Sequence, residues 1–265
     1  MIRPTATLIL WMTALLSSPT AFPQATQGEP GKYLMLVATK NLDPTHEDAF
    51  NHWYNDIDIP DVLNVPGYLR ARRGMREIAD SMRPGTNERQ YLALYDIETS
   101  NIDATIIDML LAAKRMDATG RSIASLKVTE RVYFRELGVT VLPTSRPAGR
   151  QTFWYLERVR CCRDDATENA LNDWYEHTRV PDVHAAQESG LVRLSRYRVH
   201  RVVMIEPLQV PRYLAIYEFS VDSANDVTDA IRRLDERERK EGRMSDLLTD
   251  HDAAVYGQLR EVVRP

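Results

Sequence analysis

The chain has 265 residues, of which 43% are hydrophobic and 27% are charged. This composition is typical of a globular protein with one large or two small domains, and it does not indicate a disordered chain. The formal net charge is −4, and lysine and arginine are scattered among acidic residues. Because no basic field is present to attract phosphate backbones, nucleic acid is not an expected partner.

Residues 1–25 have the pattern of an export signal. Arg3 is the lone early charge, and an apolar run follows from Leu8 to Leu16, as in a cleaved secretory signal. An uncleaved membrane anchor is the alternative, but the run is much shorter than the ~20 apolar residues of a spanning helix. We therefore expect an exported protein, periplasmic or secreted, without a stable membrane anchor. Residues 26–31 are expected to form a flexible lead-in.

Two sequence blocks occur twice in the chain. WYNDIDIPDV at residues 53–62 returns as WYEHTRVPDV at residues 174–183, with matches at Trp, Tyr, Pro, Asp and Val. YLALYD at residues 91–96 returns as YLAIYE at residues 213–218, at nearly the same offset. Two blocks repeated in the same order predict two copies of one structural unit.

Each copy is predicted to contain six elements in the order strand, helix, strand, strand, helix and strand. In the first copy these lie at residues 32–39, 45–55, 68–75, 90–97, 101–116 and 126–137. In the second copy they lie at residues 153–159, 167–175, 191–204, 212–219, 224–238 and 254–263. Pro60 and Pro181 are expected to end the first helix of each copy, because the residue before a proline disfavours helical backbone angles.

This order of elements predicts the fold class. A βαββαβ unit is the ferredoxin-like arrangement, an antiparallel sheet with both helices on one face. The other sheet face is then bare and apolar, and two such faces in one chain can bury each other. We therefore predict an α+β fold in which two tandem ferredoxin-like βαββαβ units form a pseudo-dimeric α/β barrel around a small-molecule pocket. The first unit is placed at residues 32–137, a linker at 138–150 and the second unit at 151–265.

The segment WYNDIDIPDVLNVPGYLRARR at residues 53–73 resembles the helix-to-second-strand signature of the dimeric α/β-barrel superfamily, in its EthD-like branch. That signature has a Trp-Tyr pair, a His-x-Pro-Asp/Glu element and a Pro-Gly-Phe/Tyr strand entry. The resemblance covers nearly all the chain from Tyr33 onward, once per copy, and is clearer in the first copy. It implies a ferredoxin-like barrel that is usually a dimer of single-copy chains. The superfamily includes cofactor-free monooxygenases, isomerases, cyclases, haem enzymes and accessory proteins, so the resemblance leaves the activity open.

The sequence departs from this signature at one chemically important position. Five residues after the Trp, where relatives often have His, the first copy has Asp58 and the second has Arg179. A carboxylate beside a Trp-Tyr pair would be partly desolvated, which would raise its pKa toward the range of a general base. The alternative is a helix-end carboxylate that caps the next turn or pairs with Arg72 or Arg73. Because the copies differ here, they hold one working site and one scaffold copy, or one composite site.

His177 and His184 are the other candidate catalytic residues, because they lie in the equivalent region of the second copy and imidazole titrates near neutral pH. Exposed histidines without a catalytic role are the alternative. The sequence contains no H-x-x-x-H or H-E-x-x-H metal motif, no dinucleotide-binding glycine motif, no P-loop and no G-x-S-x-G element. We therefore predict no metal and no nucleotide cofactor.

The candidate substrate-binding residues are the repeated aromatics and the arginines and tyrosine near them. Aromatics at this spacing mostly pack a helix against a sheet, which is the alternative for each of them. An arginine that points into an apolar barrel would instead select an acidic, enolate or phenolate ligand. The candidates are Trp53, Tyr54, Arg72, Trp174, Tyr175, Arg179 and Tyr197.

The two cysteines of the chain are adjacent, Cys161 and Cys162, so they cannot link distant parts of the chain. They are either two thiols at a strand end or loop, or a vicinal disulfide that could act as a redox switch.

Two functional classes remain open. The first is a cofactor-independent acid–base enzyme, of lyase, isomerase, dehydratase or cyclase type, acting on a small, largely apolar or aromatic molecule outside the cytoplasm. The second is a non-catalytic binding or accessory protein, and a homodimer is compatible with both. A pocket with a desolvated carboxylate or histidine beside tyrosine or arginine would favour the enzyme, and a wholly apolar or collapsed cavity would favour the binding protein.

Overall fold

The computed structural model of the chain describes residues 30–78, 90–143, 149–162, 164–186, 190–205, 211–249 and 251–264. The predicted export signal lies outside these residues, as does the middle of the predicted linker. Among the described helices none is long and apolar enough to cross a membrane.

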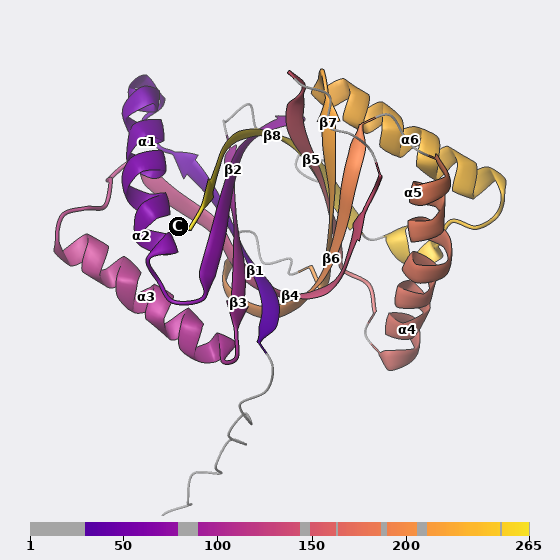
Figure 1. The fold of residues 1–265 in the computed structure, drawn as a ribbon, viewed down its shortest axis with the longest axis horizontal. Helices are drawn as coiled ribbons and strands as arrows, with labels where there is room; N and C mark the ends of the chain where they lie inside the picture. The colour runs from indigo at the N-terminus through magenta and orange to yellow at the C-terminus, as the bar shows by residue number, and fades with distance from the viewer. Residues whose placement is uncertain are drawn as a thin grey trace, which may run out of the picture.

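The described residues contain eight strands that close into one antiparallel barrel (Figure 1). The strands are β1 (Gly31–Asn41), β2 (Tyr68–Ile78), β3 (Gln90–Thr99), β4 (Leu126–Val141), β5 (Gln151–Val159), β6 (Leu191–Ile205), β7 (Tyr213–Val221) and β8 (His251–Val263). Their order around the barrel is β1-β3-β2-β8-β5-β7-β6-β4. Each half therefore has the ferredoxin-like strand order, and the pairs β2·β8 and β4·β6 join the halves. The predicted fold class is confirmed.

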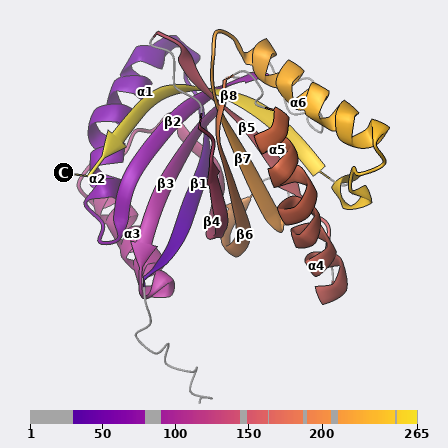
Figure 2. The same cartoon turned by 45° about the vertical axis from the view of Figure 1, so that its right-hand side comes forward.

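Helices cover the outer face of each half. They are α1 (Glu47–Trp53), α2 (Ile59–Leu63), α3 (Ile102–Ala118), α4 (Asp165–Trp174), α5 (Val180–Ala186) and α6 (Ala224–Lys240). The first three lie against the sheet of the first half and the last three against that of the second, on opposite sides of the barrel (Figures 1 and 2). Alternate side chains of each strand face the helices or the barrel interior, which produces two helix–sheet cores and one central core.

The central core lies inside the barrel, and a cavity of about 210 Å³ is lined in part by the inward-facing Asp96 and Tyr197, so a pocket enclosed by the barrel stays a prediction. Leu34, Leu92, Phe134, Trp154 and Tyr256 belong to this core and are buried. Large apolar side chains from both halves meet there, because each sheet can cover its inner face only with the other sheet. The cavity that concerns function lies outside the barrel, between the first sheet and its helices.

Pro60 and Pro181 do not end their helices, so that prediction is wrong. A π-helical turn, Tyr54–Asp58, joins α1 to α2, and the Ile59 N–H donates to the Tyr54 carbonyl five residues back. This wide turn restarts the hydrogen-bond pattern, which places Pro60 in the first turn of α2, where its missing N–H costs least. The second half repeats the arrangement around Pro181.

The predicted linker begins later than expected. Residues 138–141 continue β4 and pair with residues 193–196 of β6. The first part of the predicted linker is therefore strand. Its pairing with β6 closes the barrel between the two halves.

Gly190 and Gly67 mark the same point in each half, the entry to β6 or β2, and both have φ of +91°. A Cβ at Gly190 would lie 2.4 Å from a Val221 methyl and 2.6 Å from the Ser220 carbonyl oxygen. We expect Gly190→Ala to reduce the free energy of unfolding by about 1–3 kcal/mol, the usual cost of a non-glycine residue in a sparsely populated backbone region. The close contacts add to this cost. Urea denaturation measures the loss.

Gly149→Ala is the matched control. Gly149 has φ of +89°, but no atom of the described residues would lie within 4 Å of a Cβ at this position. Equal losses in the two variants would show that the close approach at Gly190 contributes nothing.

Candidate active site

A cavity with a volume of about 310 Å³ lies between the first sheet and α1, α2 and α3. Its wall is mixed, and the apolar part includes Met35 and Val37 from β1 and Met109 and Met116 from α3. Tyr54 and Asp58 of the π-helical turn, Tyr95 of β3 and Arg131 of β4 are among the polar side chains in the wall, which also include Thr39, Asp117 and Ser122. Three of the predicted site residues, Trp53, Tyr54 and Asp58, therefore line the same cavity.

Asp58 is the last residue of the π-helical turn. Burial raises the pKa of its carboxyl from 3.8 to about 6, although the Tyr95 hydroxyl and the charges of Arg131 and Arg73 act in the opposite direction. The Tyr95 hydroxyl donates a hydrogen bond of 3.2 Å to Asp58 Oδ2. Asp58 makes no capping hydrogen bond to α2, so the structure does not place it in the alternative role of a helix cap.

Tyr54 and Tyr95 stay neutral beside this carboxylate. Burial is the largest cause that raises the pKa of each phenol, and the negative charge of Asp58 raises it further. Both hydroxyls can therefore donate hydrogen bonds at neutral pH, as a phenol does when it remains protonated.

Arg131 brings a positive charge to the cavity from β4. Its Nε is buried and has no hydrogen-bond partner within the described chain. Arg73, the other arginine whose charge acts on Asp58, is held by the protein itself. Its guanidinium lies 4.5 Å from the centre of the Tyr54 ring and donates a hydrogen bond of 2.8 Å to Asn51.

Arg72 does not face the cavity. Strand alternation points it into the barrel, opposite to Arg73, where its guanidinium lies 2.8 Å from Asp96 and 3.6 Å from Glu218. Tyr197 also belongs to the central core. These two predicted substrate-binding residues therefore meet inside the barrel, apart from Asp58, so the alternative in which Asp58 pairs with Arg72 does not hold.

The repeated Trp and Asp residues hold the helices together in the first half. The Trp53 indole N–H donates to the Arg121 carbonyl at 2.6 Å, and the Arg121 guanidinium binds both oxygens of Asp61 at 2.8 and 2.9 Å. Trp53 is thus anchored just beyond the end of α3, and its ring contributes to the cavity wall. Arg121 was not among the predicted site residues.

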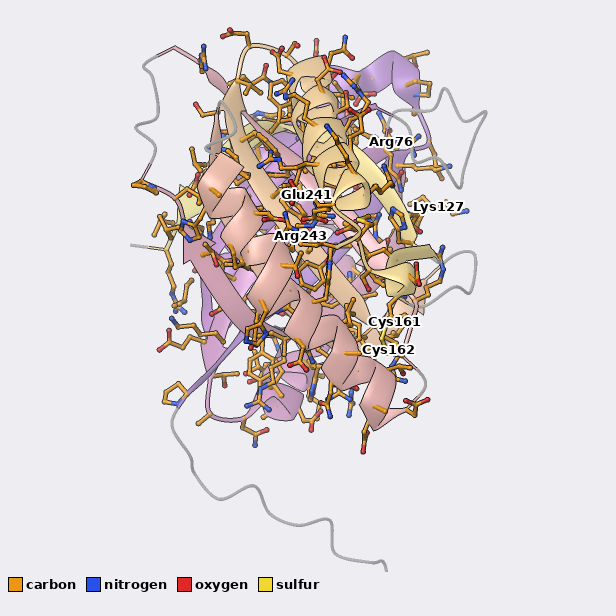
Figure 3. The ribbon with its side chains drawn as sticks, turned by 90° about the vertical axis from the view of Figure 1, so that its right-hand side faces the viewer. Arg76, Lys127, Cys161, Cys162, Glu241 and Arg243 are labelled. Atoms are coloured by element: carbon orange, nitrogen blue, oxygen red, sulfur yellow. A yellow bond between two sulfur atoms is a disulfide. The ribbon has the colours of Figure 1, made fainter. Side chains whose placement is uncertain are left out.

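The second half contains the same anchor. The Trp174 indole N–H donates to the Arg243 carbonyl at 2.8 Å, and the Arg243 guanidinium lies 2.6 Å from Asp182. Figure 3 shows Arg243 with Glu241, its other partner, after the end of α6. Each of the two arginines follows a glycine after the second helix of its half, a repeated pair that could have identified them.

A buried ion cluster occupies the second half at the position that corresponds to Asp58. Arg179 is 1% exposed, and its Nη2 lies 2.8 Å from Asp235 and 3.3 Å from Glu238 of α6. Tyr175 donates a hydrogen bond of 2.9 Å to Glu157 in the same region. The predicted substrate-binding residues Arg179, Trp174 and Tyr175 thus have partners within the protein.

The strand registers show how the charges differ between the halves. Val37 pairs with Ala93 and Arg131, whereas Glu157 pairs with Ala215 and Ala253. Glu157 therefore corresponds to Val37, and Ala253 to Arg131. The first half thus has Asp58 on the helical turn and Arg131 on a strand, whereas the second half has Arg179 on the helical turn and Glu157 on a strand.

His177 and His184 are both exposed. The His177 ring nitrogen Nδ1 lies 3.0 Å from the Asp173 carbonyl oxygen, one turn back along its own helix. The structure does not bring either histidine together with Asp58 or Tyr197. Their predicted catalytic role stays a prediction.

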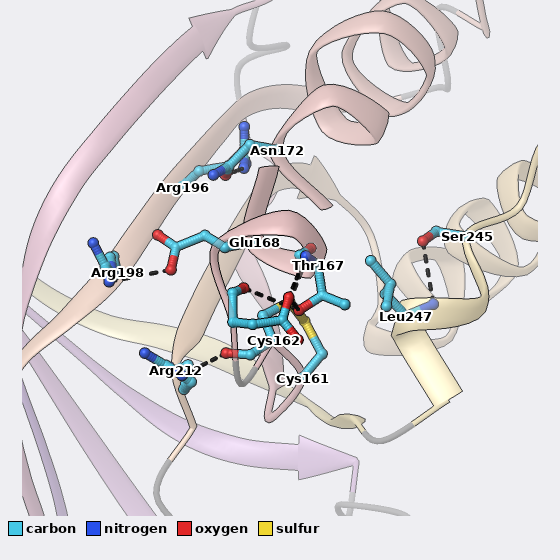
Figure 4. Close-up of a disulfide and its surroundings, with 11 residues drawn as sticks. Cys161, Cys162, Thr167, Glu168, Asn172, Arg196, Arg198, Arg212, Ser245 and Leu247 are labelled. Atoms are coloured by element: carbon cyan, nitrogen blue, oxygen red, sulfur yellow. Dashed lines mark hydrogen bonds and ion pairs between the residues drawn. A yellow bond between two sulfur atoms is a disulfide. The ribbon is translucent and has the colours of Figure 1, made fainter. Parts of the chain in front are cut away.

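Cys161 and Cys162 form a vicinal disulfide between β5 and α4 (Figure 4). Cys162 has φ of 75°, and the Arg212 guanidinium donates to its carbonyl. Its side chain packs in the helix–sheet core of the second half. Of the two alternatives from the sequence, the structure has the disulfide.

The groups that the cavity offers are those of acid–base chemistry. Nowhere in the described ranges do three His, Cys, Asp or Glu side chains gather closely enough to hold a metal ion. Chemistry without a metal or nucleotide stays a prediction, and Asp58, Arg131 and the two phenols are the groups on which a mechanism can draw.

Comparison with known proteins bears on the fold. A protein described as a candidate monooxygenase from Fusobacterium nucleatum subsp. nucleatum is similar in structure, with a TM-score of 0.57, 8% identity, and coverage of 88% of this chain and 95% of that chain. An anthrone oxidase-like protein has a TM-score of 0.52 and 11% identity, with coverage of 88% and 93%. The chain has the dimeric α/β-barrel fold. In this dimeric α/β barrel, both halves come from one chain. No protein-family profile matches the sequence, and no curated protein matches it.

Proposed function

We propose that the chain is a cofactor-independent acid–base enzyme, of lyase, isomerase, dehydratase or cyclase type, that acts on a small, largely apolar molecule. Asp58 is the general base. The observation that carries this proposal is a carboxyl group with a pKa raised to about 6 by burial in a cavity of about 310 Å³, beside two neutral phenols.

A base of this kind is suited to proton abstraction at neutral pH. Catalysis is most effective when the pKa of the base lies near the working pH, because the group is then both ionised and basic. An ordinary aspartate is ionised but a weaker base. The methionine and valine side chains of the wall keep Asp58 desolvated and offer a substrate apolar surface to bury.

The alternative of a non-catalytic binding protein has less support. Burying a carboxylate costs free energy of desolvation, and a pocket that only binds a ligand does not need one. Groups with perturbed pKa values are also concentrated at catalytic sites. The names of the two similar structures, a candidate monooxygenase and an anthrone oxidase-like protein, also agree with an enzyme that acts on small molecules.

Four further points belong to the same proposal. The chain belongs to the EthD-like branch, and its two halves arose by tandem duplication. It is exported to the periplasm or the medium, and two chains can associate as a homodimer.

The pH dependence of the reaction tests the proposal. We expect kcat/KM, for a substrate found by screening, to rise with pH and level off above a pH of about 6, because Asp58 must lose its proton before it can accept one from the substrate. The rising limb should be absent in Asp58→Asn. A profile that is flat between pH 5 and 8 in the wild type would remove Asp58 from the role of base.

A further inference from the structure

Arg131 is the charged residue of the cavity that the proposed function does not yet use. It lies on β4, lines the cavity with Asp58, and has a buried Nε without a hydrogen-bond partner in the described residues. A buried donor without a partner costs free energy. This Nε is out of reach of a water molecule, so a ligand in the cavity would be bound by the outer guanidinium nitrogens of Arg131, which make no hydrogen bond or ion pair with another described residue.

The fold itself does not require an arginine at this position. Its counterpart in the second half is Ala253, as the strand registers show. The second half also has an arginine, Arg179, but its carboxylate partners hold it at 2.8 and 3.3 Å. The first half has alanine and methionine, Ala113 and Met116, along the cavity wall of α3, and these offer no such partners.

The charges of the cavity restrict the ligand. Asp58 and Arg131 carry opposite charges, and the remaining charged group of the wall, Asp117, is on the exposed rim. A ligand with a permanent negative charge would add to the charge of Asp58 in a desolvated space, which is costly. A neutral ligand that becomes an oxyanion only when Asp58 takes its proton keeps the sum of the charges unchanged.

We propose that the substrate is a neutral carbonyl compound with an acidic C–H bond next to the carbonyl, and that Arg131 binds the oxygen as negative charge develops on it. This inference rests on the proposed function, because Asp58 removes the proton. The C–H electron pair forms the C=C bond of an enolate, and the carbonyl π pair moves to the oxygen. Where the substrate also has a C=C bond at the β,γ position, the enolate is a dienolate: the oxygen pair re-forms the C=O bond, the C=C bond moves to the α,β position, and the γ carbon takes the proton back from Asp58. This completes an isomerisation without an oxidant or reductant.

Exchange of 2-tetralone protons for deuterium in D₂O, followed by NMR, tests this step on a defined carbonyl probe. We expect the wild type to accelerate the exchange above the uncatalysed rate. Arg131→Met should lower the acceleration by about 10²–10³-fold, the usual effect of removing one donor to an oxyanion. Arg135→Met is the matched control, because Arg135 lies on the same strand but is exposed. The control variant should catalyse the exchange as fast as the wild type.

Binding of 2-naphthol, which resembles the enol of 2-tetralone, gives a readout that does not depend on Asp58 as a base. We expect the wild type to bind 2-naphthol more tightly than naphthalene, and Arg131→Met to lose this preference. Arg131→Lys keeps the positive charge and should retain part of the preference for 2-naphthol. It is the control for a misfolded Arg131→Met variant. A wild type that neither prefers 2-naphthol nor exchanges 2-tetralone protons would overturn the substrate class.

The outcomes separate this inference from the proposed function. If Asp58→Asn abolishes exchange and Arg131→Met leaves it unchanged, Asp58 is the base and the role of Arg131 is wrong. If Arg131→Met loses the preference for 2-naphthol while Asp58→Asn exchanges like the wild type, the ligand class holds and the base is wrong.

Discussion

Asp58→Asn is expected to lower kcat by about 10²–10⁴-fold while KM changes little, because proton transfer by a positioned base contributes about this much to the rate. Asparagine keeps the size of the side chain and can still accept the hydrogen bond from Tyr95, which spans 3.2 Å in the wild type. Steady-state kinetics on a screened substrate measures both constants.

His177→Gln is the control for this substitution, since His177 is exposed and lies in the second half. It should react at the wild-type rate. Wild-type rates in both variants, and in the double variant, would place the reaction at a site elsewhere.

Stability distinguishes a catalytic loss from a structural one. Because burial raises the pKa of Asp58 from 3.8 to about 6, the folded state holds its proton more tightly than the unfolded state. This contribution to stability is complete below pH 4 and is lost as pH rises through 6. Asp58→Asn removes the cost of burying the charge, so it should raise the free energy of unfolding at pH 8 by up to about 3 kcal/mol. An active-site variant that is slower and more stable cannot owe its slowness to unfolding.

Arg179→Met is expected to reduce the free energy of unfolding by about 3–5 kcal/mol, the usual effect of removing one partner from a buried ion pair. Arg179 is 1% exposed, and its loss leaves Asp235 and Glu238 without their cation. Urea denaturation at pH 8 measures the change. Burial raises the pKa of Glu238 to about 7, against the opposing charge of Arg179, so the loss should be smaller at pH 5, where protonation removes one unpaired charge.

Arg232→Met is the matched control on α6, because Arg232 is 57% exposed and pairs with Asp229 and Glu236 at 3.1 Å. Exposed pairs of this kind contribute little to stability, so this variant should unfold at nearly the same urea concentration as the wild type. Similar losses in both arginine variants would show that burial does not decide the effect. A large loss confined to Arg179→Met would show that the buried ion cluster stabilises the second half.

Much of the fold could be predicted because its signals are local. Patterns of apolar residues identified the strands and helices, and the WY…PDV and YLA blocks identified the two units. The barrel followed from the need of each bare sheet face for a partner. The π-helical turn Tyr54–Asp58 could not be predicted, because the proline that it accommodates is otherwise a sign that a helix ends.

The candidate site was predicted less completely, because it depends on which face each strand presents. Asp58 and Tyr54 belong to the repeated block and were found. Arg72 was expected in the site and points into the barrel, whereas Arg131 was not predicted and lines the cavity. Only the register between β1 and β4, which places Arg131 opposite Val37, shows where its side chain lies.

Closure of the barrel within one chain has a consequence for synthesis and folding. While the ribosome makes the chain, β2 and β4 each lack the neighbour that β8 and β6 will later supply. The last strand must return to the first half, where Arg264 donates to the Val65 carbonyl across 199 residues of sequence. Contacts of such long range form slowly. Until these contacts form, the open edges of one molecule can pair with the same edges of a second molecule. Refolding at high protein concentration should therefore yield intertwined dimers, and refolding at low concentration should yield monomers.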